Sequence, residues 1–108
     1  MSEEKYKIKI LPPAQRELEE IAHVHYELIG SQSARKITNR IYDSLAHLSA
    51  MTHMGVSCAD KPLKSQGYRI LICGNYLCIY RMIEDTVFVY HIADGRADYP
   101  KLMNDLPK

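Results

Sequence analysis

Side chains suited to phosphate chemistry gather in the final third of the sequence. Arg69, Arg81, His91, Arg96 and Tyr99 lie on, or just after, a series of strand-like runs. Arginine carries a permanent charge on a planar fork that matches phosphate, and histidine and tyrosine can move protons or stack on a base. Together such groups could bind a phosphodiester and stabilise the charge that develops when an RNA 2′-hydroxyl cleaves it.

His91 and Arg96, and the tyrosines of the strands, also have a purely structural interpretation. His91 lies on an apolar strand, where histidine is usually a hydrogen-bonded core residue. Tyrosine is common in strands whatever their function. Arg96 follows Gly95 and can simply pair with Asp94 or Asp98. The sequence leaves both interpretations open.

Other kinds of site are poorly supported. The sequence has no H-E-x-x-H, glycine-rich phosphate loop, G-x-S-x-G or paired-carboxylate signature. Its three cysteines form no C-x-x-C pair, so we expect reduced cysteines that pack in the core, with no metal and no cofactor. His23 and His25 are two residues apart, face different sides of a helix and cannot share a metal there.

Two helices are expected to support these strands. Residues 6–11 alternate polar and apolar side chains, as in a half-buried edge strand. Pro12 and Pro13 then open a helix, which Gly30 ends, and Ser31 or Ser33 caps a second helix. The short connection predicts an antiparallel helical hairpin lying across one face of a sheet.

The sheet itself is expected from three runs at residues 68–73, 76–82 and 86–92. Gly74 and Asn75 form a two-residue turn signal, and the nearly all-apolar third run predicts a central strand. We expect residues 52–66, which carry Lys61 and Lys64, to be a loop, and residues 98–106 to form a short helix.

The two-residue turn also predicts which side chains share a face. We expect the isoleucine-rich face to meet the helices and the other face to stay open. The first face holds Ile70, Ile72, Leu77, Ile79 and Arg81, and the second holds Arg69, Leu71, Cys73, Tyr76, Cys78 and Tyr80.

Length and charge bound the remaining possibilities. The 108 residues predict one domain, 1–108, of α+β class: a small antiparallel sheet with an N-terminal helical hairpin on one face. A net charge of +1 is not that of a strongly basic nucleic-acid binder, so such a role would need a local patch. No run approaches the ~20 apolar residues of a membrane span, and we expect a cytoplasmic protein.

Two strings in this layout, GYRILICGNYLCIY and HIADGRADY, preceded by Pro12-Pro13-Ala14 at a helix start, resemble the RelE/ParE superfamily of toxins from bacterial type II toxin–antitoxin modules. The resemblance covers nearly the whole chain. It implies a small sheet with two N-terminal helices, and a cognate antitoxin whose C-terminal segment wraps the toxin in a hetero-oligomer. It implies either metal-independent cleavage of mRNA on the ribosome, as in RelE-like members, or poisoning of DNA gyrase, as in ParE-like members.

The resemblance also suggests site residues. Arg69 matches a basic residue on the family's second strand, Arg96 matches the arginine after the last strand, and Tyr99 lies where a tail tyrosine could act. With His91 these form the candidate catalytic set, and Lys61, Lys64 and Arg81 are candidates for binding RNA or another target.

Two departures weigh against a ribonuclease. Leu71 and Leu77 stand where ribonuclease members carry cations. One contact of that kind can be worth ~3 kcal/mol in the transition state. Three possibilities remain: a ribosome-dependent ribonuclease, a gyrase inhibitor that acts by binding, and a catalytically silent relative that only binds its antitoxin.

Overall fold

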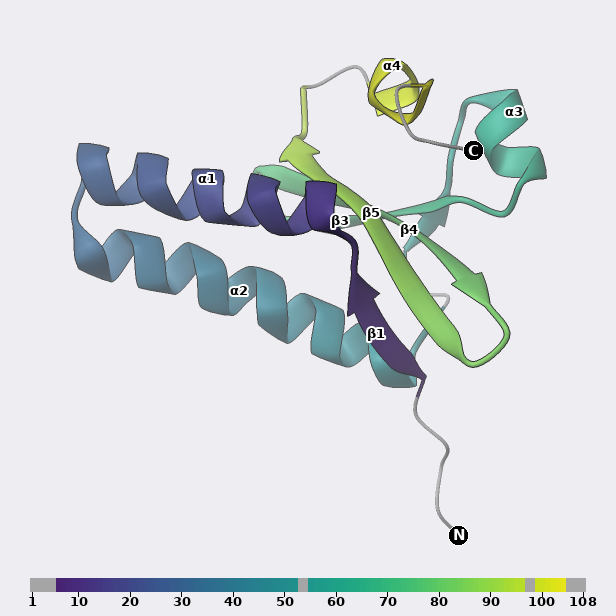
Figure 1. Ribbon diagram of the computed structural model, residues 1–108, viewed down its shortest axis with the longest axis horizontal. Helices are drawn as coiled ribbons and strands as arrows, with labels where there is room; N and C mark the ends of the chain where they lie inside the picture. Colours follow the sequence, from purple (N-terminus) through teal and green to yellow (C-terminus); the bar gives the residue numbers. More distant parts are fainter. Residues whose placement is uncertain (1–5, 53–54, 97–98, 105–108) are drawn as a thin grey trace, which may run out of the picture.

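The computed structural model describes residues 6–52, 55–96 and 99–104, which form a five-stranded sheet with helices on both faces (Figure 1). In chain order the elements are β1 Lys7–Ile10, α1 Pro12–Leu28, α2 Ser31–Ala50, β2 Val56–Ser57, α3 Lys61–Ser65, β3 Arg69–Cys73, β4 Tyr76–Ile83, β5 Thr86–Asp94 and α4 Tyr99–Asn104. The α+β fold class is confirmed.

The strands lie in the order β1-β5-β4-β3-β2. Neighbouring strands from β2 to β5 are antiparallel, but β1 runs parallel to β5, so the sheet is mixed rather than purely antiparallel. This pairing is possible because the two long helices carry the chain away from β1, and parallel neighbours need such a long connection. β5 has a strand on each side, as its apolar sequence predicted.

The helical hairpin forms where it was expected. Pro12 lies in the first turn of α1, where its missing N–H costs no hydrogen bond. Gly30, with φ of +125°, separates the two helices. The predicted serine cap is wrong: Gly30 occupies the N-cap of α2 without a side-chain hydrogen bond, Ser31 is already helical, and the Ser33 hydroxyl contacts His25 instead.

The β3–β4 turn matches its prediction. Cys73 pairs with Tyr76, so Gly74 and Asn75 are the whole loop, and Gly74 adopts the positive φ of +64° that this tight turn requires. Further along, the register between β4 and β5 shifts between Ile79 and Tyr80. This irregularity lets Val89 and Ile92, which differ in parity, face the same core.

The prediction of which face meets the helices is wrong. The hairpin covers Leu71, Cys73, Cys78 and Tyr80, while the isoleucine-rich face meets α3 and α4. The hairpin core contains Ala14, Leu18, Ile41, Leu45, Leu48, Leu71, Cys73, Cys78, Tyr80, Val87, Val89 and Ile92. The second core contains Cys58, Leu63, Tyr68, Ile70, Leu77, Ile79 and Met103.

Tyr80 can be completely buried in the hairpin core because its hydroxyl is satisfied there. It donates to the Thr52 carbonyl at 2.9 Å and accepts the Gly55 N–H at 3.2 Å. The two-residue turn correctly predicted which side chains share a face. It could not predict that Tyr80 lies on the covered face, because that depends on its distant hydrogen-bond partners Thr52 and Gly55.

The segment at residues 52–66 is not only a loop. It contains the two-residue strand β2 and the helix α3, whose N-cap Asp60 accepts a hydrogen bond from the Leu63 N–H. Both elements are too short to show a periodic pattern in sequence. Of the predicted C-terminal helix, α4 is seen, and positions 98 and 105–106 lie outside the described residues.

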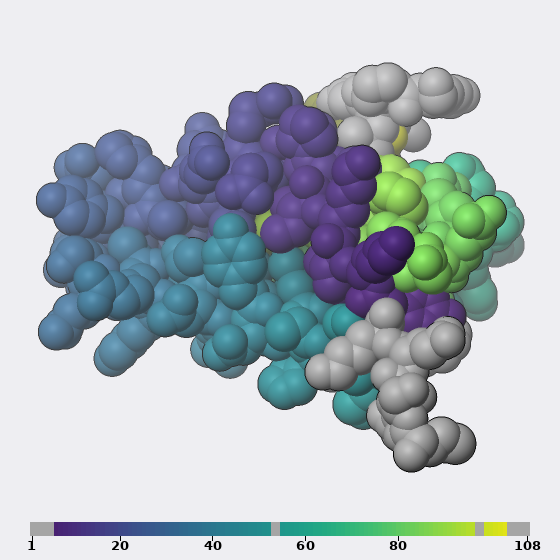
Figure 2. Space-filling view, turned by 60° about the horizontal axis from the view of Figure 1, so that its bottom comes forward, coloured from purple at the N-terminus to yellow at the C-terminus, as the bar shows by residue number. Residues whose placement is uncertain are grey.

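In space the hairpin projects well beyond the sheet, and its tip lies at the far end of the molecule from α3 (Figure 1). Figure 2 shows α1 and α2 lying against each other as one continuous surface that reaches β1. Within the described ranges, no helix combines the length and apolar character that crossing a membrane requires.

Candidate functional site

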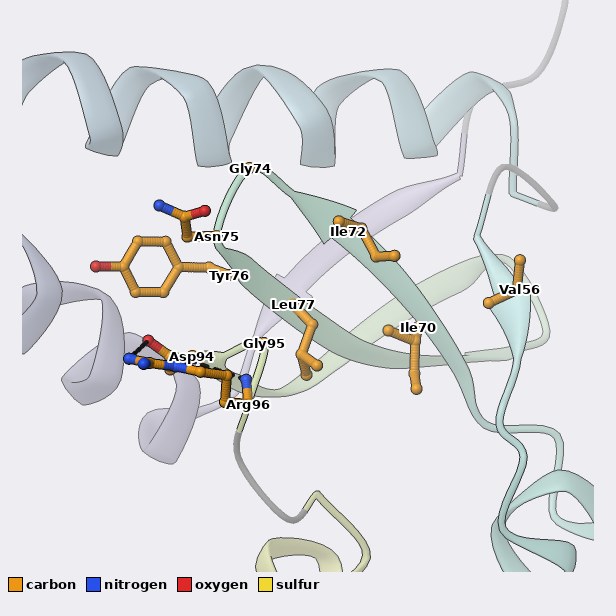
Figure 3. Close-up of a pocket in the computed structure, with 10 residues that line it drawn as sticks. All are labelled: Val56, Ile70, Ile72, Gly74, Asn75, Tyr76, Leu77, Asp94, Gly95 and Arg96. Atoms are coloured by element: carbon orange, nitrogen blue, oxygen red, sulfur yellow. Dashed lines mark hydrogen bonds and ion pairs between the residues drawn. The ribbon is translucent and has the colours of Figure 1, made fainter.

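A groove runs along the β2–β3 side of the sheet, and we call it the sheet-edge groove (Figure 3). It measures about 730 Å³. Ile72 and Val56, which are 70% and 60% exposed, supply its apolar surface. Its lining residues are Val56, Ile70, Ile72, Gly74, Asn75, Tyr76, Leu77, Asp94, Gly95 and Arg96.

One end of the groove carries an ion pair between Arg96 and Asp94. The Arg96 Nε lies 3.0 Å from Asp94 Oδ1, and the Arg96 backbone N–H donates to the same oxygen at 2.9 Å. The hydrogen bonds from Arg96 lower the pKa of Asp94, and Asp94 raises the pKa of Arg96 in turn. The Arg96 side chain is 92% exposed, so this pair is a solvated feature of the groove rim.

Arg69, on β3, faces the neighbouring strand rather than Arg96. Its guanidinium donates to the Gly55 carbonyl and to the Ser57 hydroxyl, the latter at 3.2 Å. Arg69 therefore fastens the short strand β2 and the residue before it to the sheet.

Arg81 lies toward the opposite end of the sheet from Arg96. It pairs with Phe88 near the β4–β5 turn, whereas Arg96 follows the far end of β5. Its guanidinium stacks over the Tyr68 ring at 4.6 Å and donates to the Tyr90 hydroxyl at 2.9 Å. Burial raises the pKa of Tyr68, although the Arg81 charge opposes that effect.

His91 lies against α1, away from the three arginines' polar contacts. Its Nδ1 is 2.9 Å from Glu17 Oε1, and the same oxygen accepts the Ile92 backbone N–H at 3.1 Å. The His91 side chain is 10% exposed, and its Nε2 is buried without a hydrogen-bond partner among the described residues. This burial and pairing correspond to the structural interpretation of His91.

The remaining sequence candidates lie near α3. The Tyr99 hydroxyl accepts the Ala59 backbone N–H at 3.2 Å and so links α4 to the chain that enters α3. Lys61 and Lys64 are exposed on α3. The four proposed catalytic residues therefore share no hydrogen-bond partner, and the structure does not bring them together around one point.

The structure shows a further polar cluster that the sequence did not indicate. The His25 ring lies between two hydroxyls: Nδ1 is 3.0 Å from Ser33 Oγ, and Nε2 is 3.0 Å from Tyr76 Oη. His25 lies near the end of α1 and Ser33 near the start of α2, so their closeness in sequence weakly indicated that they could contact each other. Nothing in the local sequence linked either residue to Tyr76.

The three cysteines are free and buried, as expected. Cys73 and Cys78 lie on adjacent strands with their sulfurs 3.7 Å apart. Their hydrogen bond lowers the pKa of Cys73 to about 7 and raises that of Cys78, and burial raises the pKa of Cys58. In the part of the chain that the structure describes, no three His, Cys, Asp or Glu residues are placed to hold a metal ion.

Comparison with known proteins gives a clear family match. The family model described as the ParE toxin of the type II toxin–antitoxin system parDE matches residues 8–99. No curated protein sequence matches the chain significantly.

Several solved structures have similar folds, and two of them are toxin–antitoxin systems. A chain of the chromosomal ParDE toxin–antitoxin system from P. aeruginosa has a TM-score of 0.70 and 19% identity, covering 85% of this chain and 98% of its own. A chain of the toxin–antitoxin complex RelBE2 from Mycobacterium tuberculosis has a TM-score of 0.61 and 17% identity, covering 83% and 98%. At these identities the likeness concerns the fold.

Proposed function

Because this chain belongs to the ParE toxin family of type II toxin–antitoxin systems, we propose that it inhibits growth by binding DNA gyrase and that a cognate antitoxin neutralises it. The toxin then acts in the cytoplasm as a binding protein and cuts no RNA. The observation that carries this proposal is that the four candidate catalytic residues, Arg69, His91, Arg96 and Tyr99, lie apart from one another and contact separate partners.

Metal-free RNA cleavage needs proton-transfer groups and cations to converge on one phosphate. Here Arg69 is held by Gly55 and Ser57, His91 is buried against Glu17, and Arg96 pairs with Asp94. Each group would have to leave its present partner before it could share a substrate with the others. This arrangement supports a toxin that works by binding.

The two leucines at the positions where ribonuclease members carry cations point in the same direction. Leu71 lies in the hairpin core, and Leu77 lies in the second core at the groove. Both are almost completely buried, at 6% and 7% exposure. An unpaired cation at either position would be costly to bury, so the surrounding packing favours the apolar residue.

We assign the sheet-edge groove to the antitoxin. Its exposed Ile72 and Val56 offer apolar surface, and the Arg96–Asp94 pair offers polar contacts at its rim. An apolar centre with a polar rim is the usual composition of a protein interface. β2 is also an edge strand, which an extended partner segment can extend by backbone hydrogen bonds.

The target is tested with two purified systems. The chain is added to gyrase acting on relaxed plasmid, and separately to ribosomes programmed with mRNA. We expect inhibited supercoiling and intact mRNA. Cleaved mRNA with normal supercoiling would overturn the gyrase proposal, and Arg96→Ala would then show whether Arg96 takes part in the cleavage.

The groove assignment is tested with the protein encoded by the neighbouring reading frame. Ile72→Glu places a charge in the groove and should weaken binding at least about 30-fold, as expected for a central interface residue. The matched control is Ile83→Glu, because Ile83 is also an exposed strand isoleucine but lies outside the groove lining. Equal effects of the two variants would contradict the assignment.

A further inference from the structure

The hollow between the helical hairpin and the β3–β4 turn is a second polar site, which we call the hairpin hollow. It measures about 280 Å³ and is lined by His25, Ser33, Lys36, Ile37, Arg40, Gly74, Asn75 and Tyr76. Figure 3 shows the Tyr76 ring pointing away from Ile70 and Ile72, with its hydroxyl directed out of the sheet-edge groove. The hydroxyl meets His25, in the last turn of α1.

The His25 cluster leaves a hydrogen-bond donor unused. A neutral imidazole donates through one ring nitrogen and accepts at the other, so one of its two hydroxyl neighbours receives an N–H. That hydroxyl keeps its own proton for a third group. Neither the Ser33 nor the Tyr76 hydroxyl has another hydrogen-bond partner among the described residues. The cluster therefore presents one O–H donor whichever ring nitrogen of His25 carries the proton.

The charged side chains that line the hollow are cationic. Lys36 and Arg40 are one helical turn apart on α2, and no carboxylate lines the hollow. Neither cation forms an ion pair with a described residue. The Arg40 guanidinium is packed over the turn, since a Cβ on Gly74 would come within 3.1 Å of its Nη1.

We propose that the hairpin hollow binds a phosphate group, which Lys36 and Arg40 hold by charge and Ser33 or Tyr76 holds by a hydroxyl hydrogen bond. Arginine offers the planar donor pair that phosphate prefers, and lysine adds a mobile charge. The hollow is smaller than the ~300–1,000 Å³ typical of pockets for organic ligands, which suits a single anionic group. This proposal does not depend on the target of the toxin.

Binding is measured on the purified full-length chain by titrating inorganic phosphate and following the His25 and Tyr76 ring signals by NMR. We expect these signals to shift and saturate. Lys36→Gln and Arg40→Gln should each weaken binding about tenfold, since a hydrogen bond to a charged group contributes roughly that much. The matched control is Arg35→Gln, an exposed α2 cation outside the hollow, which should change the affinity less than about twofold.

Tyr76→Phe tests the hydroxyl cluster, because it removes one oxygen and keeps the ring. If the cluster helps to bind phosphate, affinity falls; if it only fastens the hairpin to the sheet, the melting temperature falls while affinity stays the same. Unchanged affinity would remove the Tyr76 hydroxyl from the proposal. The two cation variants change exposed side chains, so they fold and test the site even if Tyr76→Phe does not.

A short DNA duplex then identifies the source of the phosphate. If the duplex moves the same ring signals and competes with inorganic phosphate, the hollow accepts a nucleic-acid backbone. If only inorganic phosphate acts, the hollow takes the free anion. If neither ligand moves the His25 and Tyr76 signals, or if Lys36→Gln and Arg40→Gln leave the affinity unchanged, the proposal is wrong.

Discussion

The helical hairpin closes the larger of the two cores against one face of the sheet, whereas α3 and α4 close a smaller core against the other face. Behind the hairpin, Ala14, Ile41 and Leu48 have no exposed surface. On the other face, Ile72 is largely exposed although it belongs to the same strand as the buried Ile70 and Leu71. The two faces thus differ in how much apolar surface is left to contact other molecules.

This difference separates stability from recognition. A large, closed core supplies most of the free energy of folding, because buried apolar area is its main favourable contribution. A smaller, incomplete core can leave apolar side chains available to a partner. Substitutions on the two faces should therefore have different effects, and the following variants test that difference from the largest expected effect to the smallest.

Matched leucine truncations compare the two cores directly. Leu48→Ala removes a completely buried side chain behind the hairpin and should lower the free energy of unfolding by about 4 kcal/mol. Leu63→Ala, under the short helix α3, should lower it by about 2 kcal/mol, because the surroundings can relax into the space. Urea unfolding followed by circular dichroism measures both. Equal losses would contradict the view that the hairpin core dominates stability.

The Glu17 carboxylate connects the hairpin to β5 and should have the next largest effect. Glu17→Ala leaves His91 Nδ1 and the Ile92 N–H without their acceptor and should cost about 2 kcal/mol of unfolding free energy. Glu17→Gln keeps one acceptor oxygen and serves as the control, with a smaller loss. A fully stable Glu17→Ala variant would show that these hydrogen bonds contribute little.

On the open face, Ile72→Ala should leave stability unchanged within about 0.5 kcal/mol, because most of this side chain is already in solvent. The same variant should weaken binding of the antitoxin. Thermal unfolding and a direct binding assay measure the two effects on one preparation. A large loss of stability would mean that Ile72 supports the fold rather than recognition.

The smallest effect is expected for Arg96→Gln at the groove rim. The pKa of Asp94 should rise toward its ordinary value once the Arg96 hydrogen bonds are gone. Because folding lowers this pKa, any stabilisation from Asp94 is present above its unfolded pKa and is lost as the pH falls through its folded pKa. An NMR titration of Asp94 measures the shift, and an identical titration curve would contradict the assigned cause.

Much of the backbone could be predicted from particular residues. Pro12, Gly30 and Gly74 each have a conformational requirement that marks an element boundary, and the structure places boundaries at all three. The elements that were missed, β2 and α3, contain two and five residues. Segments so short show no periodicity in sequence. They are held by the hydrogen bond from Arg69 to Ser57, by the N-cap hydrogen bond of Asp60, and by the packing of Leu63 in the second core.

The candidate site was harder to predict, because contacts between distant residues decide what each side chain can do. The sequence shows that His91 lies on an apolar strand, but its partner Glu17 lies on a different element, far away in the chain. The covered face was misassigned for the same reason, since Tyr80 is satisfied by Thr52 and Gly55. Local patterns carry no information on such pairs.

The parallel pairing of β1 with β5 also determines when this toxin can finish folding as it is made. Lys7 pairs with Thr86 and Ile10 with Val89, so β1 acquires its neighbouring strand only after residues 86–89 have been synthesised. Contacts between residues so far apart in sequence form slowly, because a long loop must close first. A prematurely terminated chain that lacks β5 would have no neighbour for β1 and an incomplete core. Premature termination should therefore yield an inactive protein.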